Sequence, residues 1–260
     1  DSWNPMPHGD GQKIRLRAAS NGSYYQNYSL SFEEPWMGGA KPNSFSVSLW
    51  KTIQSFNEGS KMDISGLSIG FGKRLNWPDD YFTITHSVNF QRYNLENYQT
   101  SLFDFSDGFS NNINYATTFS RNSIFNPIYP RNGSKFTLYF ELTPPYSLFK
   151  EKDYYKNLDD DQERYKFLEY NKFKFDGTWY NSLIGDLVIR THFEFGFLGT
   201  YNRSVGLPPF ERFFVGGDGL SGYSIDGREI IALRGYPNGS LSSDSGDALY
   251  NKYNIELRYP

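Results

Sequence analysis

The chain has 260 residues, and its 26 basic and 29 acidic side chains give a formal net charge of −3. Because both signs are interspersed, this near balance offers no basic surface for nucleic acid. No run reaches the roughly 18 to 20 apolar residues of a transmembrane helix, and the lack of cysteine excludes disulfides, thiolate zinc sites and thiol nucleophiles.

Alternation of apolar and polar residues is the dominant pattern along the chain. It begins with Ile14 and Leu16, and it is regular through Phe45, Val47 and Leu49. Alternation with a period of two indicates strands that have one apolar and one polar face. The segments that show it predict about ten strands, near residues 12–20, 24–36, 43–55, 60–75, 81–97, 108–123, 133–145, 168–183, 187–200 and 249–260.

Alternation alone fits both a soluble sandwich and a membrane barrel. Three features favour the barrel: strands longer than the five or six residues typical of sandwiches, a second face rich in Ser, Thr, Asn and Gly, and an aromatic content of 19%. Aromatic residues gather at strand ends, where an interfacial girdle would lie, at Trp36, Trp50, Trp77, Tyr81, Phe82, Tyr93 and Tyr98. The predicted fold class is therefore an all-β transmembrane antiparallel barrel.

The predicted connections differ strongly in length. The turn at 21–23 is a tight hairpin, and 76–80 and 185–186 are also short. Two connections are long, near 146–167 and 201–248. They fall at the same end of the strands, as expected for external loops opposite short periplasmic turns. Within the first of them, Leu158, Tyr165 and Leu168 lie near helical spacing behind three aspartates, which predicts a short helix.

The second long connection carries the densest glycine cluster of the chain, at Gly216, Gly217, Gly219 and Gly222. Glycine allows the tight bends that a loop needs to fold back into a narrow lumen. Arg234 follows, beside Gly235 and Tyr236. If Arg234 is buried it requires a carboxylate partner, and Glu256 on the polar face of the last strand is the nearest candidate. Composition alone equally fits a flexible external loop with a solvated arginine.

This part of the chain resembles the sixth loop and following strand of the BamA family of outer-membrane β-barrel assembly factors. The resemblance is carried by the Gly-Gly pair, the Leu-Arg-Gly-Tyr segment at 233–236 and the Glu-bearing strand at 254–260. The superfamily of these proteins also includes two-partner-secretion transporters. The segment 213–241 is most similar to the Bacteroidota branch, and residues 32–39 and 129–134 resemble turns of the family.

The resemblance implies a sixteen-strand barrel behind periplasmic POTRA domains. Residues 1–260 would be part of that one C-terminal barrel domain, covering about its third to twelfth strands, with the POTRA domains and terminal strands outside the chain. It implies no lateral-gate residue here, because that gate lies between the first and last strands. In the implied loop latch, Arg234 is held in the lumen through Glu256, Gly235 permits the bend and Tyr236 packs against the wall.

The implied function is folding and insertion of β-barrel proteins in the bacterial outer membrane, as the central subunit of the assembly machinery. It is not enzymatic and needs no cofactor. The implied partners are unfolded outer-membrane β-barrel clients, accessory assembly lipoproteins and outer-membrane lipid, with no nucleic acid.

Other functions have less support in the sequence. His8, His86 and His192 have no metal-ligand spacing, so no metal site is predicted, although His192 and Glu194 share the polar face of one strand. Residues 244–246 lack the elbow of a serine hydrolase, and the loop carboxylates do not follow the EF-hand pattern. A porin or a two-partner-secretion pore is the alternative, and a ten-strand outer-membrane protease is a weaker one.

Overall fold

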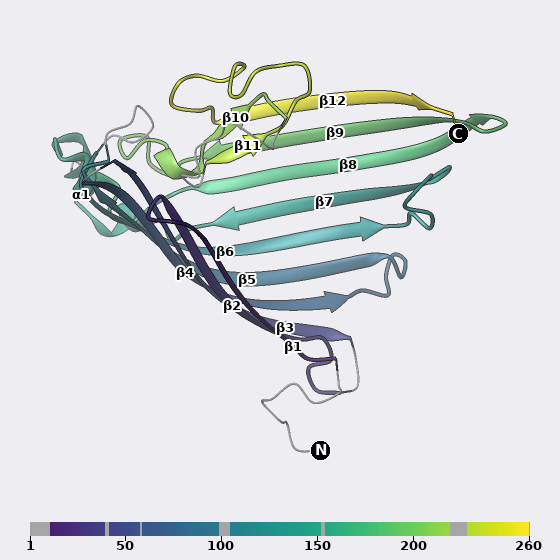
Figure 1. The fold of residues 1–260 in the computed structure, drawn as a ribbon, viewed down its shortest axis with the longest axis horizontal. Coiled ribbons are helices and arrows are strands. Elements are labelled where there is room, and N and C mark those ends of the chain that lie inside the picture. The colour runs from purple at the N-terminus through teal and green to yellow at the C-terminus, as the bar shows by residue number, and fades with distance from the viewer. Residues whose placement is uncertain are drawn as a thin grey trace.

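Ten long strands form one antiparallel sheet in the computed structural model, which describes residues 11–39, 42–57, 59–98, 105–151, 154–218 and 228–259. Neighbours along the chain are neighbours in the sheet, and β1 and β12 form its edges (Figure 1). The strands are β1 (Lys13–Asn21), β2 (Tyr25–Glu34), β3 (Asn43–Asn57), β4 (Ser60–Arg74), β5 (Phe82–Glu96), β6 (Gly108–Asn122), β7 (Gly133–Leu142), β8 (Asn171–Ile184), β9 (Leu187–Gly199) and β12 (Leu249–Arg258).

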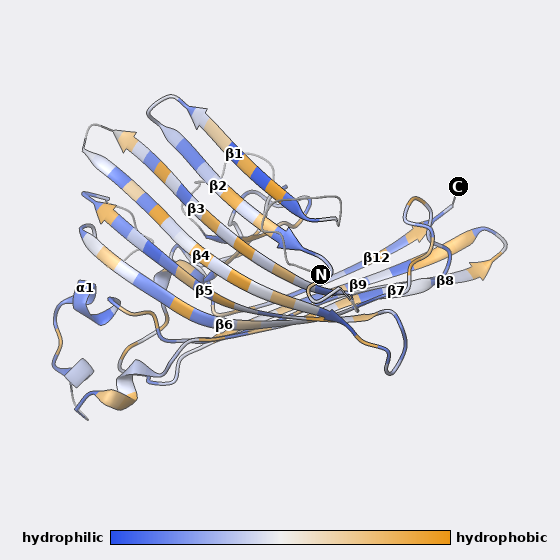
Figure 2. Ribbon diagram, turned by 90° about the horizontal axis from the view of Figure 1, so that it is seen from below, coloured by the Kyte–Doolittle hydropathy of each residue, from blue (hydrophilic) through white to orange (hydrophobic). Residues whose placement is uncertain are grey.

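The register gathers apolar side chains into rows that cross the sheet. One row runs through Leu16, Leu30, Leu49, Leu67, Phe90 and Ile113. Its members are open to the surroundings, with Leu16 81% and Leu49 48% exposed. Figure 2 shows the alternation of hydrophobic and hydrophilic residues along these strands. An extended apolar face that no described residue covers is the arrangement of a lipid-facing wall.

The opposite face, which we call the lumenal face, is polar and partly covered. A typical row runs through Ser31, Ser48, Ser68, Asn89 and Asn114. Ser68 donates to Asn89 Oδ1 at 2.6 Å, and Asn89 donates to Asn114 Oδ1 at 2.7 Å. Polar groups therefore satisfy one another across strands on the inside, while the rings and aliphatic groups face outward. A soluble sandwich has the reverse arrangement.

The connections lie at two ends of the sheet according to strand direction. The hairpin at Gly22 and the connections 97–107, 143–170 and 200–248 lie at one end. The other end holds only connections shorter than these last three, at 35–42, 75–81, 123–132 and 185–186. No helix in the described part of the chain is long and apolar enough to cross a membrane.

Short elements occupy the two long connections. The first contains η1 (Tyr146–Phe149), η2 (Tyr154–Lys156) and α1 (Asp161–Arg164), and the second contains η3 (Pro209–Glu211), β10 (Phe213–Val215) and β11 (Glu229–Ile231). The predicted loop helix is confirmed as the single turn α1, whose first turn is capped by Asp160 accepting from the Gln162 amide at 3.0 Å. The parallel pair β10 and β11 was not predicted.

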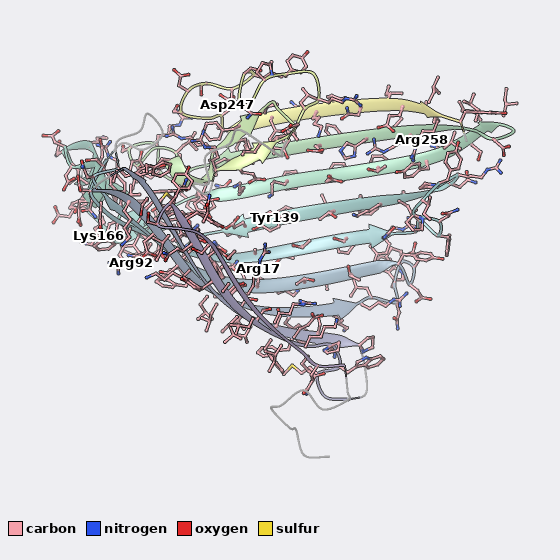
Figure 3. All side chains as sticks on the ribbon, in the orientation of Figure 1. Arg17, Arg92, Tyr139, Lys166, Asp247 and Arg258 are labelled. Atoms are coloured by element: carbon pink, nitrogen blue, oxygen red, sulfur yellow. The ribbon has the colours of Figure 1, made fainter. Side chains whose placement is uncertain are left out.

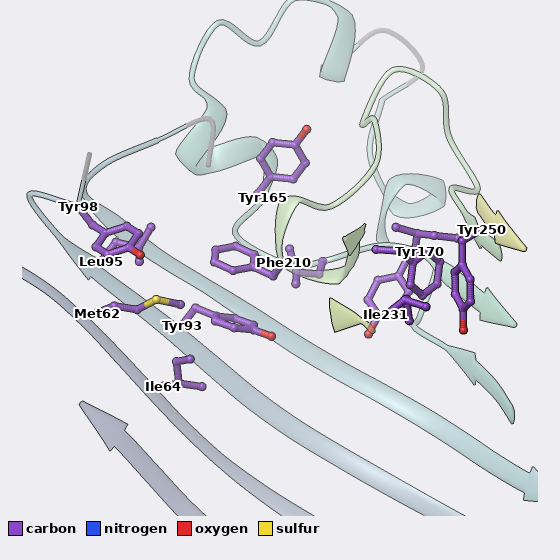
Figure 4. Close-up of a cluster of buried hydrophobic side chains, with 13 residues drawn as sticks. Met62, Ile64, Tyr93, Leu95, Tyr98, Tyr165, Tyr170, Phe210, Ile231 and Tyr250 are labelled. Atoms are coloured by element: carbon purple, nitrogen blue, oxygen red, sulfur yellow. The ribbon is translucent and has the colours of Figure 1, made fainter. Parts of the chain in front are cut away.

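The buried core lies where the long connections meet the lumenal face. Met62, Ile64, Tyr93 and Leu95 of β4 and β5 form one side (Figure 4). Phe210 from η3 stacks on Tyr93 with ring centroids 4.1 Å apart. The core therefore joins the second long connection to the wall, and it fixes that connection on the lumenal side of the sheet.

All ten predicted strands are present, with ends within three residues of the predicted bounds. The prediction succeeded because apolar and polar residues alternate over most of each strand, although β4 carries the apolar Met62 and Ile64 on its lumenal face. The Trp50 ring covers Gly66 on the lumenal face, and a Cβ at Gly66 would lie 2.2 Å from that ring. This close approach explains why a glycine stands within the strand.

Candidate functional site

We call the connection 200–248 the lumenal loop, and its described residues fold back over β8, β9 and β12. Phe213 and Asp247 exchange two backbone hydrogen bonds, both 2.9 Å, within this loop (Asp247 is labelled in Figure 3). The Leu198 amide of β9 donates to the Ala248 carbonyl at 2.7 Å. Phe213 is fully buried and packs edge-on against Tyr250 of β12, with centroids 4.8 Å apart. The loop is therefore part of the wall's interior packing.

The two halves of the sequence motif come together within the loop. The Leu233 amide donates to the Gly217 carbonyl, and the Gly217 amide donates to the Tyr236 carbonyl, both at 2.9 Å. Gly216 has φ +125° and a Cβ there would lie 2.4 Å from the Pro237 carbonyl oxygen, so both conformation and space require glycine. Gly219 and Gly222 lie outside the described residues.

Arg234 lines a cavity of about 530 Å³ between the loop and the wall. The wall side of this cavity includes His192 and Glu194 of β9 and Lys252 of β12. Arg234 is exposed and, among the residues that the structure describes, it has no hydrogen bond or ion pair. Its guanidinium therefore faces a space lined by charged side chains without being bound to one.

Gly235 has φ +92°, and a Cβ there would meet no atom within 4 Å. The need for glycine at this position is therefore conformational. Tyr236 is 48% exposed. The Tyr236 amide donates to the Leu233 carbonyl at 3.4 Å, so the motif forms a tight turn of which only Leu233 and Arg234 line the cavity.

Glu256 is paired with a residue that the sequence analysis did not name. Arg190 Nη1 lies 2.6 Å from Glu256 Oε1, and Arg258 Nε lies 4.0 Å from Glu256 Oε2. The structure has no ion pair between Arg234 and Glu256, in contrast to the expected latch. The reason is the register, since Arg190 is directly opposite Glu256 on the adjacent strand and reaches it without any movement of the loop.

A buried ionic cluster also joins the loop to β8, and sequence reasoning missed it. Lys172 Nζ lies 2.9 Å from Glu211 Oε2 and 2.7 Å from Glu229 Oε2, and Lys174 Nζ lies 2.8 Å from Glu229 Oε1. Burial alone would raise the pKa of Glu229, but the two lysines outweigh it and hold that pKa below its ordinary value. Asn112 Nδ2 donates to Glu211 Oε1 at 3.0 Å.

The clearest candidate for metal binding is Asp176, His192 and Glu194, whose potential ligand atoms lie within 4.8 Å of one another. Lys252 Nζ and His192 Nε2 lie 2.7 and 2.6 Å from the same oxygen of Glu194. The Glu194 oxygen that a metal ion would need is therefore already paired with an ammonium group and an imidazole. The arrangement is therefore an ionic and hydrogen-bonded pair within the wall, as the shared polar face of His192 and Glu194 suggested.

The fold, the outward apolar rows and the polar lumenal face with its docked loop define a membrane-spanning antiparallel β-barrel protein. The model of the Omp85 superfamily domain matches residues 8–260, and the chain belongs to this superfamily of outer-membrane barrels. It is not an enzyme family, in agreement with the expectation from the sequence.

The structure is similar to that of BamA from Haemophilus ducreyi lacking POTRA domains 1–3, with a TM-score of 0.65 and 16% sequence identity. The match covers 97% of this chain and 48% of that one, so the chain spans about half the length of that protein. At this identity the likeness shows the fold. No match was found among the curated proteins.

Proposed function

We propose that this barrel catalyses the folding and insertion of other β-barrel proteins into the outer membrane, as the central subunit of an assembly machinery. The observation that carries the proposal is the lumenal loop, whose Gly216-Gly217 pair is hydrogen-bonded to the segment 233–236 that bears Arg234. Membership of the Omp85 superfamily and the likeness to the BamA fold support it.

In this mechanism the ten strands belong to a larger barrel that opens or thins the bilayer at a seam. An exposed strand edge offers unpaired backbone groups, which template an incoming strand by β-augmentation. The partners would be unfolded outer-membrane barrel clients, accessory lipoproteins and outer-membrane lipid. No covalent step or nucleotide is required, because the incoming strand exchanges its hydrogen bonds with water for hydrogen bonds within a sheet.

The role proposed for Arg234 is a latch between the loop and the wall of β9 and β12. The cavity that it lines contains Glu194, and Glu256 lies on the same wall beside Arg190. Engagement of Glu256 would require its carboxylate to accept Arg234 together with Arg190 or in its place. Gly235 would allow the approach, and Tyr236 would pack beside it.

Depletion of the full-length protein tests the assembly function against the alternative of a pore. We expect the amounts of several unrelated outer-membrane barrels to fall together, measured by quantitative mass spectrometry of membrane fractions. Depletion of an unrelated porin is the control for general envelope stress. Constant amounts of the barrels, with loss of only one solute flux or one secreted protein, would establish a porin or a secretion pore instead.

A further inference from the structure

A single lysine of the wall contacts two acidic residues that lie on either side of the glycine cluster in the lumenal loop. Lys172 projects from β8 onto the lumenal face, and its side chain is only 4% exposed. Glu211 belongs to η3 and Glu229 to β11, and their side chains are 12% and 26% exposed. The two ion pairs therefore attach the loop to the same lysine of the wall, once before and once after its glycine cluster.

Because these charges are buried, breaking the ion pairs would cost more free energy than breaking an exposed pair. A buried ammonium or carboxylate that loses its partner carries a large desolvation cost, whereas an exposed pair contributes little. Further contacts surround the cluster: Lys172 Nζ lies 5.0 Å from the centroid of the Phe213 ring, and Asn112 donates to Glu211. Loss of the lysine would leave Glu211 without this cation, and Glu229 would keep only Lys174 among the described residues.

We propose that Lys172 is the positioning residue that docks the lumenal loop on β8, through Glu211 and Glu229. Arg234, which makes no ion pair with the described residues, then has the separate task of engaging the wall of β9 and β12. The loop is held at its base whether or not Arg234 is engaged. The link to assembly rests on the proposed function, but the docking role does not depend on it.

Hydrogen exchange of the full-length protein in lipid nanodiscs tests the docking role. We expect Lys172→Met to accelerate exchange of amides in residues 209–218 and 229–233 by about tenfold or more. Those amides include Gly216, which donates to the Ile231 carbonyl at 3.0 Å. Exchange in β3 and β4 should stay unchanged.

The matched control is Lys252→Met, since Lys252 is also a lumenal lysine in a short ion pair, 2.7 Å from Glu194, but its partner belongs to the wall. It should leave the exchange of residues 209–218 at the level of the unaltered protein. Glu211→Gln is a milder second variant in case Lys172→Met does not fold, and it should accelerate the same amides to a smaller extent.

The docking role would be overturned if the loop of Lys172→Met were as protected from exchange as that of the unaltered protein, whatever happens to assembly. If Lys172→Met does not fold, the same result in Glu211→Gln would overturn it. Equal acceleration in Lys252→Met would overturn it too, because any lumenal lysine would then have the same effect. Loss of protection with normal levels of outer-membrane barrels would uphold the docking role and count against a need for the loop in assembly.

Discussion

Replacing Arg234 by alanine in the full-length protein should lower the amounts of outer-membrane barrels while the protein itself folds normally. The guanidinium is exposed and unbound to any described residue, so its removal costs no packing. A charge-assisted hydrogen bond formed with a wall carboxylate contributes about 1.5–3 kcal/mol, which corresponds to about tenfold to hundredfold in the population of the latched loop.

The measurement is complementation of a depletion strain, with quantification of several barrels and of the variant's own folded form. Arg203→Ala is the matched control, because Arg203 is another exposed arginine of the same loop that does not line the cavity. Full restoration of all barrels by Arg234→Ala would contradict the latch role of Arg234. A variant that fails to fold would contradict the structural part of the argument.

The second large effect is expected at Gly196, where the wall packs against Phe213 of the loop. A Cβ at Gly196 would lie 2.1 Å from Tyr250 Cε1 and 3.0 Å from Phe213 Cζ. Both rings are buried and packed on each other, so neither can move aside without opening the interface. Gly196→Ala should therefore lower the free energy of unfolding by about 1–3 kcal/mol, the usual cost of overpacking a core.

Urea unfolding of the purified full-length protein, followed by tryptophan fluorescence, measures this change. Gly70→Ala is the control, since it is also a lumenal strand glycine but a Cβ there meets only the Ser46 hydroxyl within 3 Å, at 2.6 Å. That hydroxyl can rotate away, and we expect a much smaller change. Equal stability of the two variants would show that Tyr250 and Phe213 are not tightly packed at this point.

The strands could be predicted because the sheet's pattern is local. Each residue's face follows from its neighbours two positions away, so Phe136, Leu138 and Phe140 identify the outward face of β7 without any tertiary information. The barrel class followed from strand length and from the composition of the polar face. By contrast, β10 and β11 have three residues each, too few for alternation to be distinguishable from chance.

The partners of the charged side chains could not be predicted in the same way. Lys172 and Glu211 are 39 residues apart, and Lys174 and Glu229 are 55 apart, so their pairing depends on how the loop folds back. Lys172 and Lys174 do alternate with Phe173 and Phe175, which is a visible sign of lumenal lysines. Arg190 and Glu256 are paired by register, and a one-residue error in a strand end is enough to hide such a pair.

Reconstitution of the full-length protein in liposomes tests directly whether it assembles other barrels. An unfolded outer-membrane barrel is added, and its folding rate is followed by the appearance of a protease-resistant form. We expect faster folding than in empty liposomes for several unrelated barrels, and for Arg234→Ala a rate close to that of empty liposomes. Folding at the empty-liposome rate for every barrel tested, together with ion conductance by the reconstituted protein, would contradict this expectation.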